Sequence, residues 1–245
     1  MSNFSKLDEN VFLLSVLKDG ENAFSDIEID RLATELPEDI ELTEYQYYVQ
    51  KVGFYIVNTT SWCKQLDLAI DLLSNFNYSR KEASRADHLI YNIENYLIRI
   101  KSVHDRVLQL VNAVFHLCIN EANVNHGVIV SNYKVQHRPD ILKAVKAVSK
   151  YLSEHEQIRH TLIHRHSLID KDLKKIELFY LTNFEHIDNE DQVKAYKYVR
   201  TEHLKRFLSD KKSEFREINS TLYTLIDTLF SSLKSEYERQ KNIVG

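Results

Sequence analysis

The stretch Ile158–Ser167, which reads IRHTLIHRHS, places three histidines and two arginines within ten residues. Histidine moves protons near neutral pH, and an arginine guanidinium can hold a phosphate through two parallel hydrogen bonds. An arginine and a histidine on one helix can therefore form half of a site for phosphoryl chemistry. This stretch is the strongest candidate for a functional site in the chain.

Helical phase divides the polar residues of this stretch into two flanks. Each residue of an ideal helix advances by 100°. Arg159 then lies close to His166, whereas His160 and His164 lie together on the other side of an apolar stripe. The phase leaves open whether His164 or His166 is the partner of Arg159.

Two other interpretations of the stretch compete with a catalytic one. The histidines and arginines could simply form a solvated basic face of a helix. Alternatively, Glu156, His160 and His164 stand at i, i+4 and i+8, a spacing that can place metal ligands on one face. No HExxH motif and no second Cys/His cluster accompanies them, so we expect neither a metal nor another cofactor.

The elements that must position these residues are helical. Only 4 Gly and 2 Pro occur in 245 residues, so turns are scarce, and apolar residues recur at spacings of three and four. Thr43 is a candidate N-cap, and Pro139 suits the first turn of a helix. The sequence predicts an all-α, up-and-down helical bundle, with a loop over residues 120–140 and helices over residues 43–76, 86–119, 140–168, 172–186 and 191–240.

Charge divides the chain into an acidic segment and a basic body. Residues 1–45 carry 3 Lys+Arg and 12 Asp+Glu, whereas residues 46–245 carry 29 and 24. We expect an acidic N-terminal segment over residues 1–40, either a solvated extension or a cover over a basic surface, and a helical domain over residues 41–245. The two cysteines lack partner spacing, and neither an export signal nor a membrane span is evident, so we expect a cytoplasmic protein.

Two segments resemble the HEPN family. RHTLIH, residues 159–164, is similar to the R-x4-6-H motif of HEPN domains, in which a polar residue, most often Asn, follows the Arg. His160 occupies that polar position here, and His166 fits the longer spacing. The stretch YLIRIKSVHDRVLQLVNAVF, residues 96–115, resembles the long helix before the motif in stand-alone bacterial HEPN proteins. The resemblance covers roughly residues 45–170, which leaves the extra C-terminal helices unmatched.

The resemblance implies a homodimer in which the motifs of two subunits face one another. HEPN ribonucleases cleave RNA without metal through attack of the ribose 2′-OH on the adjacent phosphate. By this analogy His164 is the general acid or base, Arg159 holds the phosphate, and His160 orients the pair. His166 is the alternative partner of Arg159. Further candidates for binding or support are Arg165, Asp105 and Arg99, although the charges on residues 99–106 also fit a solvated helix face.

The sequence therefore supports two functional hypotheses. The first is a metal-independent HEPN endoribonuclease in a toxin or phage-defence role, with RNA as substrate and a cognate antitoxin or regulatory protein as a further partner. Residues 134–175 favour RNA, because they carry 10 Lys+Arg and 5 His against 5 Asp+Glu. The second is a catalytically inactive HEPN bundle that binds RNA, a nucleotide or a protein. No P-loop, GxGxxG or GxSxG motif supports nucleotide hydrolysis or acyl transfer.

Overall fold

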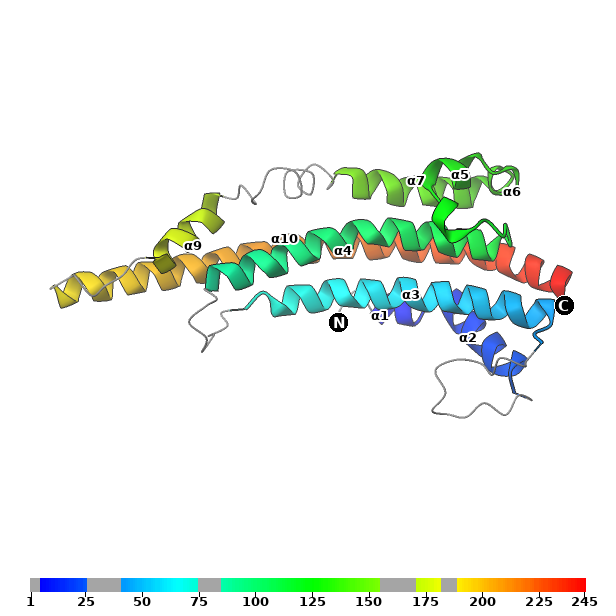
Figure 1. Ribbon diagram of the computed structural model, residues 1–245, viewed down its shortest axis with the longest axis horizontal. Coiled ribbons are helices and arrows are strands. Elements are labelled where there is room, and N and C mark those ends of the chain that lie inside the picture. The colour runs from blue at the N-terminus through cyan, green and yellow to red at the C-terminus, as the bar shows by residue number, and fades with distance from the viewer. Residues whose placement is uncertain (1–4, 26–40, 75–84, 155–170, 182–188) are drawn as a thin grey trace. The chain divides into compact units, whose positions relative to one another are not determined.

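The computed structural model describes residues 5–25, 41–74, 85–154, 171–181 and 189–245. Within these ranges the regular elements are helices and no strand occurs, which confirms the predicted all-α class. Figure 1 shows the helices in chain order. Their bounds are α1 Ser5–Asp8, α2 Val11–Ala23, α3 Glu44–Leu72, α4 Arg85–Val114, η1 Glu121–Asn123, α5 His126–Ser131, α6 Tyr133–Gln136, α7 Pro139–Glu154, α9 Lys171–Leu181 and α10 Glu190–Val244. None of the described helices is both long enough and apolar enough to cross a membrane.

The start of α3 confirms Thr43 as its N-cap. The Thr43 hydroxyl accepts a hydrogen bond from the backbone N–H of Gln46 at 3.2 Å, and the Gln46 side chain accepts one from the backbone N–H of Thr43 at 3.0 Å. This reciprocal pair satisfies two backbone N–H groups that the first helical turn leaves without partners. The Gln46 amide also donates to the carbonyl of Ala23 at 2.9 Å, which ties the start of α3 to the end of α2.

Helix α4 ends at Val114, earlier than the apolar pattern predicts. His116 and Cys118 have φ values of 46° and 55°, in the left-handed region that interrupts an α-helix. The Asn112 side chain accepts from the Ile119 N–H at 3.2 Å and donates to the Ile119 carbonyl at 2.9 Å, which holds the chain in this turn. The prediction of helix to residue 119 is therefore wrong, because hydropathy does not report backbone handedness.

The expected loop over residues 120–140 is also wrong in part, because it contains short helices. Three asparagines begin them. Asn120, Asn125 and Asn132 each accept a hydrogen bond of 3.0 Å from a backbone N–H two or three residues later. Asparagine is a strong N-cap residue, so a run that looks like a polar loop becomes η1, α5 and α6.

The chain forms two compact units, and α3, α4, α7 and α10 contribute to both. The first comprises Met1–Lys64, Ser102–Tyr151 and Ser220–Gly245, and the second comprises Gln65–Lys101 and Leu152–Asn219. The division of the chain into an acidic segment over residues 1–40 and a domain over residues 41–245 stays a prediction.

The first unit joins α2 and α10 through an aromatic core and polar contacts. Phe12 meets Phe230 and Tyr237 edge-on, with ring centroids 6.0 and 5.5 Å apart. The Tyr237 hydroxyl donates to Asp19 at 2.9 Å, and the Lys241 ammonium lies 2.8 Å from the same carboxylate. Residues of the predicted acidic segment are thus part of a packed core.

The second unit is organised around Tyr96 of α4. Its ring stacks on Phe215 of α10 at a centroid distance of 3.8 Å, and its hydroxyl donates to the Asn219 side chain at 2.8 Å. The Asn219 amide in turn donates to Asp67 of α3 at 2.7 Å. This chain of hydrogen bonds satisfies the buried polar atoms of Tyr96 and Asn219 and aligns the three helices.

Replacement of Phe12 tests whether α2 belongs to the folded core. Phe12 is 0% exposed, so we expect Phe12→Ala to lower the free energy of unfolding by about 3–5 kcal/mol. Leu14 on the same helix is 51% exposed, and Leu14→Ala should cost less than about 1 kcal/mol. Urea denaturation measures both values. Equal losses in the two variants would contradict the packing of α2.

Candidate functional site

The motif residues themselves lie outside the described residues. This holds for Arg159, His160, His164, Arg165 and His166. Their roles therefore remain the predictions made from the sequence. The structure describes the helices that precede and follow them, since α7 ends at Glu154 and α9 begins at Lys171.

Helix α7 has one buried and one basic face. Its start at Pro139 confirms the predicted first-turn proline. The buried face consists of Ile141, Ala144, Val145, Val148 and Leu152. The opposite face carries three exposed lysines, Lys143, Lys146 and Lys150. The helix that leads into the motif thus presents positive charge to solvent.

The two supporting residues predicted on α4 do not form a common site. The Arg99 side chain donates from Nε to the Asn95 side chain at 2.9 Å and from Nη1 to Gln65. Asp105 is exposed. Six residues of an α-helix advance by about 240°, so the two side chains leave different faces of α4. Contact of either residue with the motif stays a prediction.

The other polar residues of this part of α4 have specific partners. The Arg106 guanidinium lies 3.6 Å from the centroid of the Trp62 ring, a cation–π contact. Trp62 itself is partly buried. His104 and His126 approach within 3.3 Å through Nε2 and Nδ1.

The second unit contains a polar cavity beside α9. It has a volume of about 500 Å³, and α9 and α10 line it with Asp172, Lys175, His203, Arg206, Phe207, Asp210, Lys211 and Glu214. Its charges form pairs along each helix, such as Lys211 with Glu214 at 2.9 Å. His203 Nε2 is buried and has no hydrogen-bond partner among the described residues. Such a nitrogen could bind a polar group that enters the cavity.

Sequence reasoning missed this cavity because its charges look like ordinary surface pairs. Oppositely charged residues three or four apart are typical of a solvated helix face. Only the packing of α9 on α10 encloses them. Among the residues that the structure describes, no group of three His, Cys, Asp or Glu side chains could hold a metal ion.

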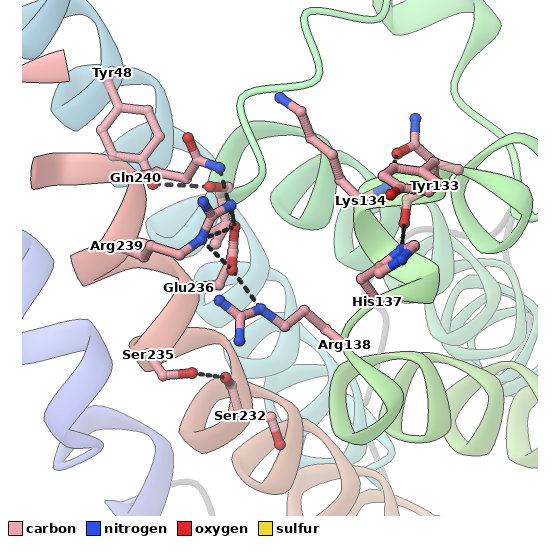
Figure 2. A network of polar contacts seen from close by, with 12 residues as sticks. Tyr48, Tyr133, Lys134, His137, Arg138, Ser232, Ser235, Glu236, Arg239 and Gln240 are labelled. Atoms are coloured by element: carbon pink, nitrogen blue, oxygen red, sulfur yellow. Dashed lines mark hydrogen bonds and ion pairs between the residues drawn. The ribbon is translucent and has the colours of Figure 1, made fainter. Parts of the chain in front are cut away.

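A buried carboxylate in the first unit holds two arginines. Glu236 of α10 is 0% exposed. Figure 2 shows its carboxylate between the guanidinium groups of Arg138 and Arg239, which donate from Nε to Oε2 at 2.8 and 3.1 Å. The Gln240 side chain donates to Oε1 at 3.0 Å. All four residues belong to the first unit.

These donors lower the pKa of the Glu236 carboxyl. Burial by itself would raise the pKa of the carboxyl, but hydrogen bonds from Arg239, Gln240 and Arg138 outweigh it and lower the pKa below its ordinary value. The carboxylate therefore stays ionised. Sequence reasoning missed the cluster, since 98 positions separate Arg138 from Glu236 and only the Glu236–Arg239 spacing was visible.

A family comparison covers most of the chain. Residues 35–234 match the model of a HEPN-like family. The chain belongs to the HEPN family. Neither the curated proteins nor the solved structures gave a significant match.

Membership in the HEPN family agrees with the observed all-α bundle and confirms the resemblance drawn from RHTLIH and residues 96–115. The match extends well past residue 170, into α10. The C-terminal helices, which the sequence resemblance left unmatched, are thus part of the HEPN region. The motif residues Arg159 and His164 fall within the matched range.

Glu236→Gln tests the arginine cluster of this HEPN chain. We expect the variant to lose about 2 kcal/mol of unfolding free energy at neutral pH, because the charge-assisted hydrogen bonds to the carboxylate weaken and two guanidinium groups remain without a counter-ion. The folded-state pKa of Glu236 lies below its ordinary value of 4.5, so its stabilisation is complete above about that pH and is lost as the pH falls further.

Urea denaturation at neutral pH and at progressively lower pH measures this effect. The difference between the parent and Glu236→Gln should shrink as the pH falls below about 4.5. Glu217 is an exposed glutamate on the same helix, and Glu217→Gln should change stability by less than about 0.5 kcal/mol. A deficit for Glu236→Gln that does not depend on pH would contradict the assignment.

Proposed function

We propose that this HEPN protein is a metal-independent endoribonuclease that acts as a homodimer. The observation that supports this most strongly is the Arg159 and His164 pair, which has the spacing of the R-x4-6-H motif and lies within the matched HEPN range. Since one helix supplies only half of a site, the second copy of the motif would come from the partner subunit.

The chemistry assigned to these residues needs no cofactor. The 2′-OH of a ribose attacks the adjacent phosphorus and gives up its proton to a base. The bond from phosphorus to the 5′ oxygen breaks, and that oxygen takes a proton from an acid. The products are a 2′,3′-cyclic phosphate and a 5′-OH end. In this proposal His164 transfers a proton, Arg159 stabilises the charge that develops on the phosphate, and His160 orients the pair. His166 is the alternative acid or base.

Charge near the motif supports RNA as the substrate. Lysines line the exposed face of α7 up to Lys150, and the motif follows. Lysine and arginine neutralise phosphates, whatever the base sequence. Arg165 would add a further phosphate contact. Arg99 and Asp105, both on α4, would bind the substrate or support the motif residues.

We place this activity in the cytoplasm, in a toxin or phage-defence system, with a cognate antitoxin or regulatory protein as partner. A ribonuclease that attacks cellular RNA must be held inactive until it is needed. In this proposal residues 41–245 form the ribonuclease domain, and the acidic residues 1–40 precede it.

One residue favours a second function. His160 stands where HEPN ribonucleases most often have Asn. A departure from the motif at this position fits a HEPN bundle that binds RNA, a nucleotide or a protein without cleavage.

Cleavage assays distinguish the two functions. We expect the purified protein to cut single-stranded RNA in the presence of EDTA and to leave 2′,3′-cyclic phosphate and 5′-OH ends. Arg159→Ala and His164→Ala should each lower the rate by about 10²-fold or more while retaining the helical circular-dichroism spectrum, because each removes a group that acts in the transition state. Arg216, exposed on α10 and outside the polar cavity, offers a matched control, and Arg216→Ala should cut at the parental rate.

The histidine variants decide whether His164 or His166 transfers the proton. Activity retained in His164→Ala and lost in His166→Ala would assign proton transfer to His166. If Arg159→Ala combined with both histidine replacements cuts as fast as the parent, the enzyme proposal fails. Binding of RNA without any cleavage by the parent would support the second function.

A further inference from the structure

The Glu236 cluster presents two arginines to solvent in a defined orientation. Arg138 and Arg239 each donate a hydrogen bond from Nε to the buried carboxylate. Their side chains nevertheless remain 38% and 44% exposed. A guanidinium has five N–H donors in a rigid fork. Because Glu236 holds two cations and carries one negative charge, the cluster keeps a net positive charge and can bind an anion.

An exposed aromatic pair lies close to this cluster in the chain. Tyr133 is 73% exposed, and its ring packs on His137 with the centroids 4.0 Å apart. His137 is fixed by a contact of 2.8 Å from its Nδ1 to the Tyr133 carbonyl. Figure 2 shows Tyr133 of α6 and His137, which follows the last residue of that helix. An exposed, held tyrosine ring is a platform on which an unpaired base can stack.

Further positive charge lies on α7, the next helix in the chain. Residues 134–150 carry five Lys or Arg and one Asp. Lys143, Lys146 and Lys150 fall within an arc of about 60° on the exposed face, opposite the buried Val145 and Val148. Because α7 is followed by the segment that holds Arg159 and His164, the lysine row runs toward the motif along the chain.

We propose that this surface, defined by Tyr133, Lys134, Arg138, Lys143, Lys146, Lys150 and Arg239, binds single-stranded RNA. The cations would contact phosphates, and Tyr133 would stack on a base. Stacking requires a base that is free of a paired strand, which favours a single strand over a duplex. The inference rests on the proposed function in taking RNA as the ligand, and it assigns a contact surface outside the R-x4-6-H motif.

Binding can be measured with an RNA that the protein does not cleave. A fluorescein-labelled, mixed-sequence single strand with 2′-O-methyl riboses lacks the attacking hydroxyl, so the intact parental chain can be used in fluorescence anisotropy. In the variant with Lys143, Lys146 and Lys150 all replaced by Gln, we expect binding to weaken about tenfold or more. The slope of log K against log salt should become shallower by about 2, since each lost phosphate contact on a single strand accounts for about 0.7.

A matched variant controls for the change in net charge. Lys194, Lys197 and Lys205 are exposed on α10, and their joint replacement by Gln should leave the affinity within about twofold of the parent and the salt slope unchanged. Tyr133→Ala should weaken binding about tenfold, whereas Tyr133→Phe, which keeps the ring, should bind as the parent does.

Three results would overturn the inference. One is unchanged affinity and salt slope in the α7 variant, and another is an equal loss in the α10 control. The third is tighter binding of a duplex of the same sequence than of the single strand. Because the probe cannot be cleaved, weaker binding by the α7 variant would support this surface even if the parent failed to cut ordinary RNA. Cleavage by the parent with unchanged probe binding in the α7 variant would support the proposed function alone.

Discussion

The structure depends on the burial of one apolar face along α10, the 55-residue helix Glu190–Val244. A helix of this length cannot gain its stability from local propensity, and its apolar side must be covered by other helices. Leu204, Phe207 and Phe215 are buried in the second unit, and Leu222, Leu229 and Leu233 are buried in the first. Both compact units therefore rely on the same helix.

Polar contacts set the alignment that apolar burial leaves free. Hydrophobic contact is non-directional, so a helix could slide by one turn at little cost if only apolar groups met. Such a shift would break the hydrogen bond between Tyr96 and Asn219 in the second unit. It would also break the one between Tyr237 and Asp19 in the first unit. Glu236 adds the strongest constraint, because a buried carboxylate needs Arg138 and Arg239 together.

The Glu236 cluster connects stability with the proposed function. The interaction that joins the start of α7 to α10 also orients two guanidinium groups whose outer edges face solvent. Arg138 immediately precedes the basic face of α7, which leads along the chain to the motif. In a HEPN ribonuclease an RNA strand must be held for the 2′-OH to attack in line, and a surface built on rigid helices meets that requirement better than a loop.

The sequence by itself determined the elements whose signals are local. Periodic apolar residues predicted α3, α4, α7 and α10, Thr43 and Pro139 marked two helix starts, and RHTLIH indicated the HEPN family that the comparison confirmed. These features depend on residues close together in the chain, so their spacing is visible without a structure.

The tertiary structure decided the features that depend on distant residues or on backbone handedness. The left-handed φ values of His116 and Cys118 end α4 early, and Arg106 of α4 stacks on the Trp62 ring of α3. The cavity at His203 and the pairing of Arg138 with Glu236 arise only when separate helices pack. Local spacing carries no information about which side chains meet across a bundle, because that is set by how the buried faces fit together.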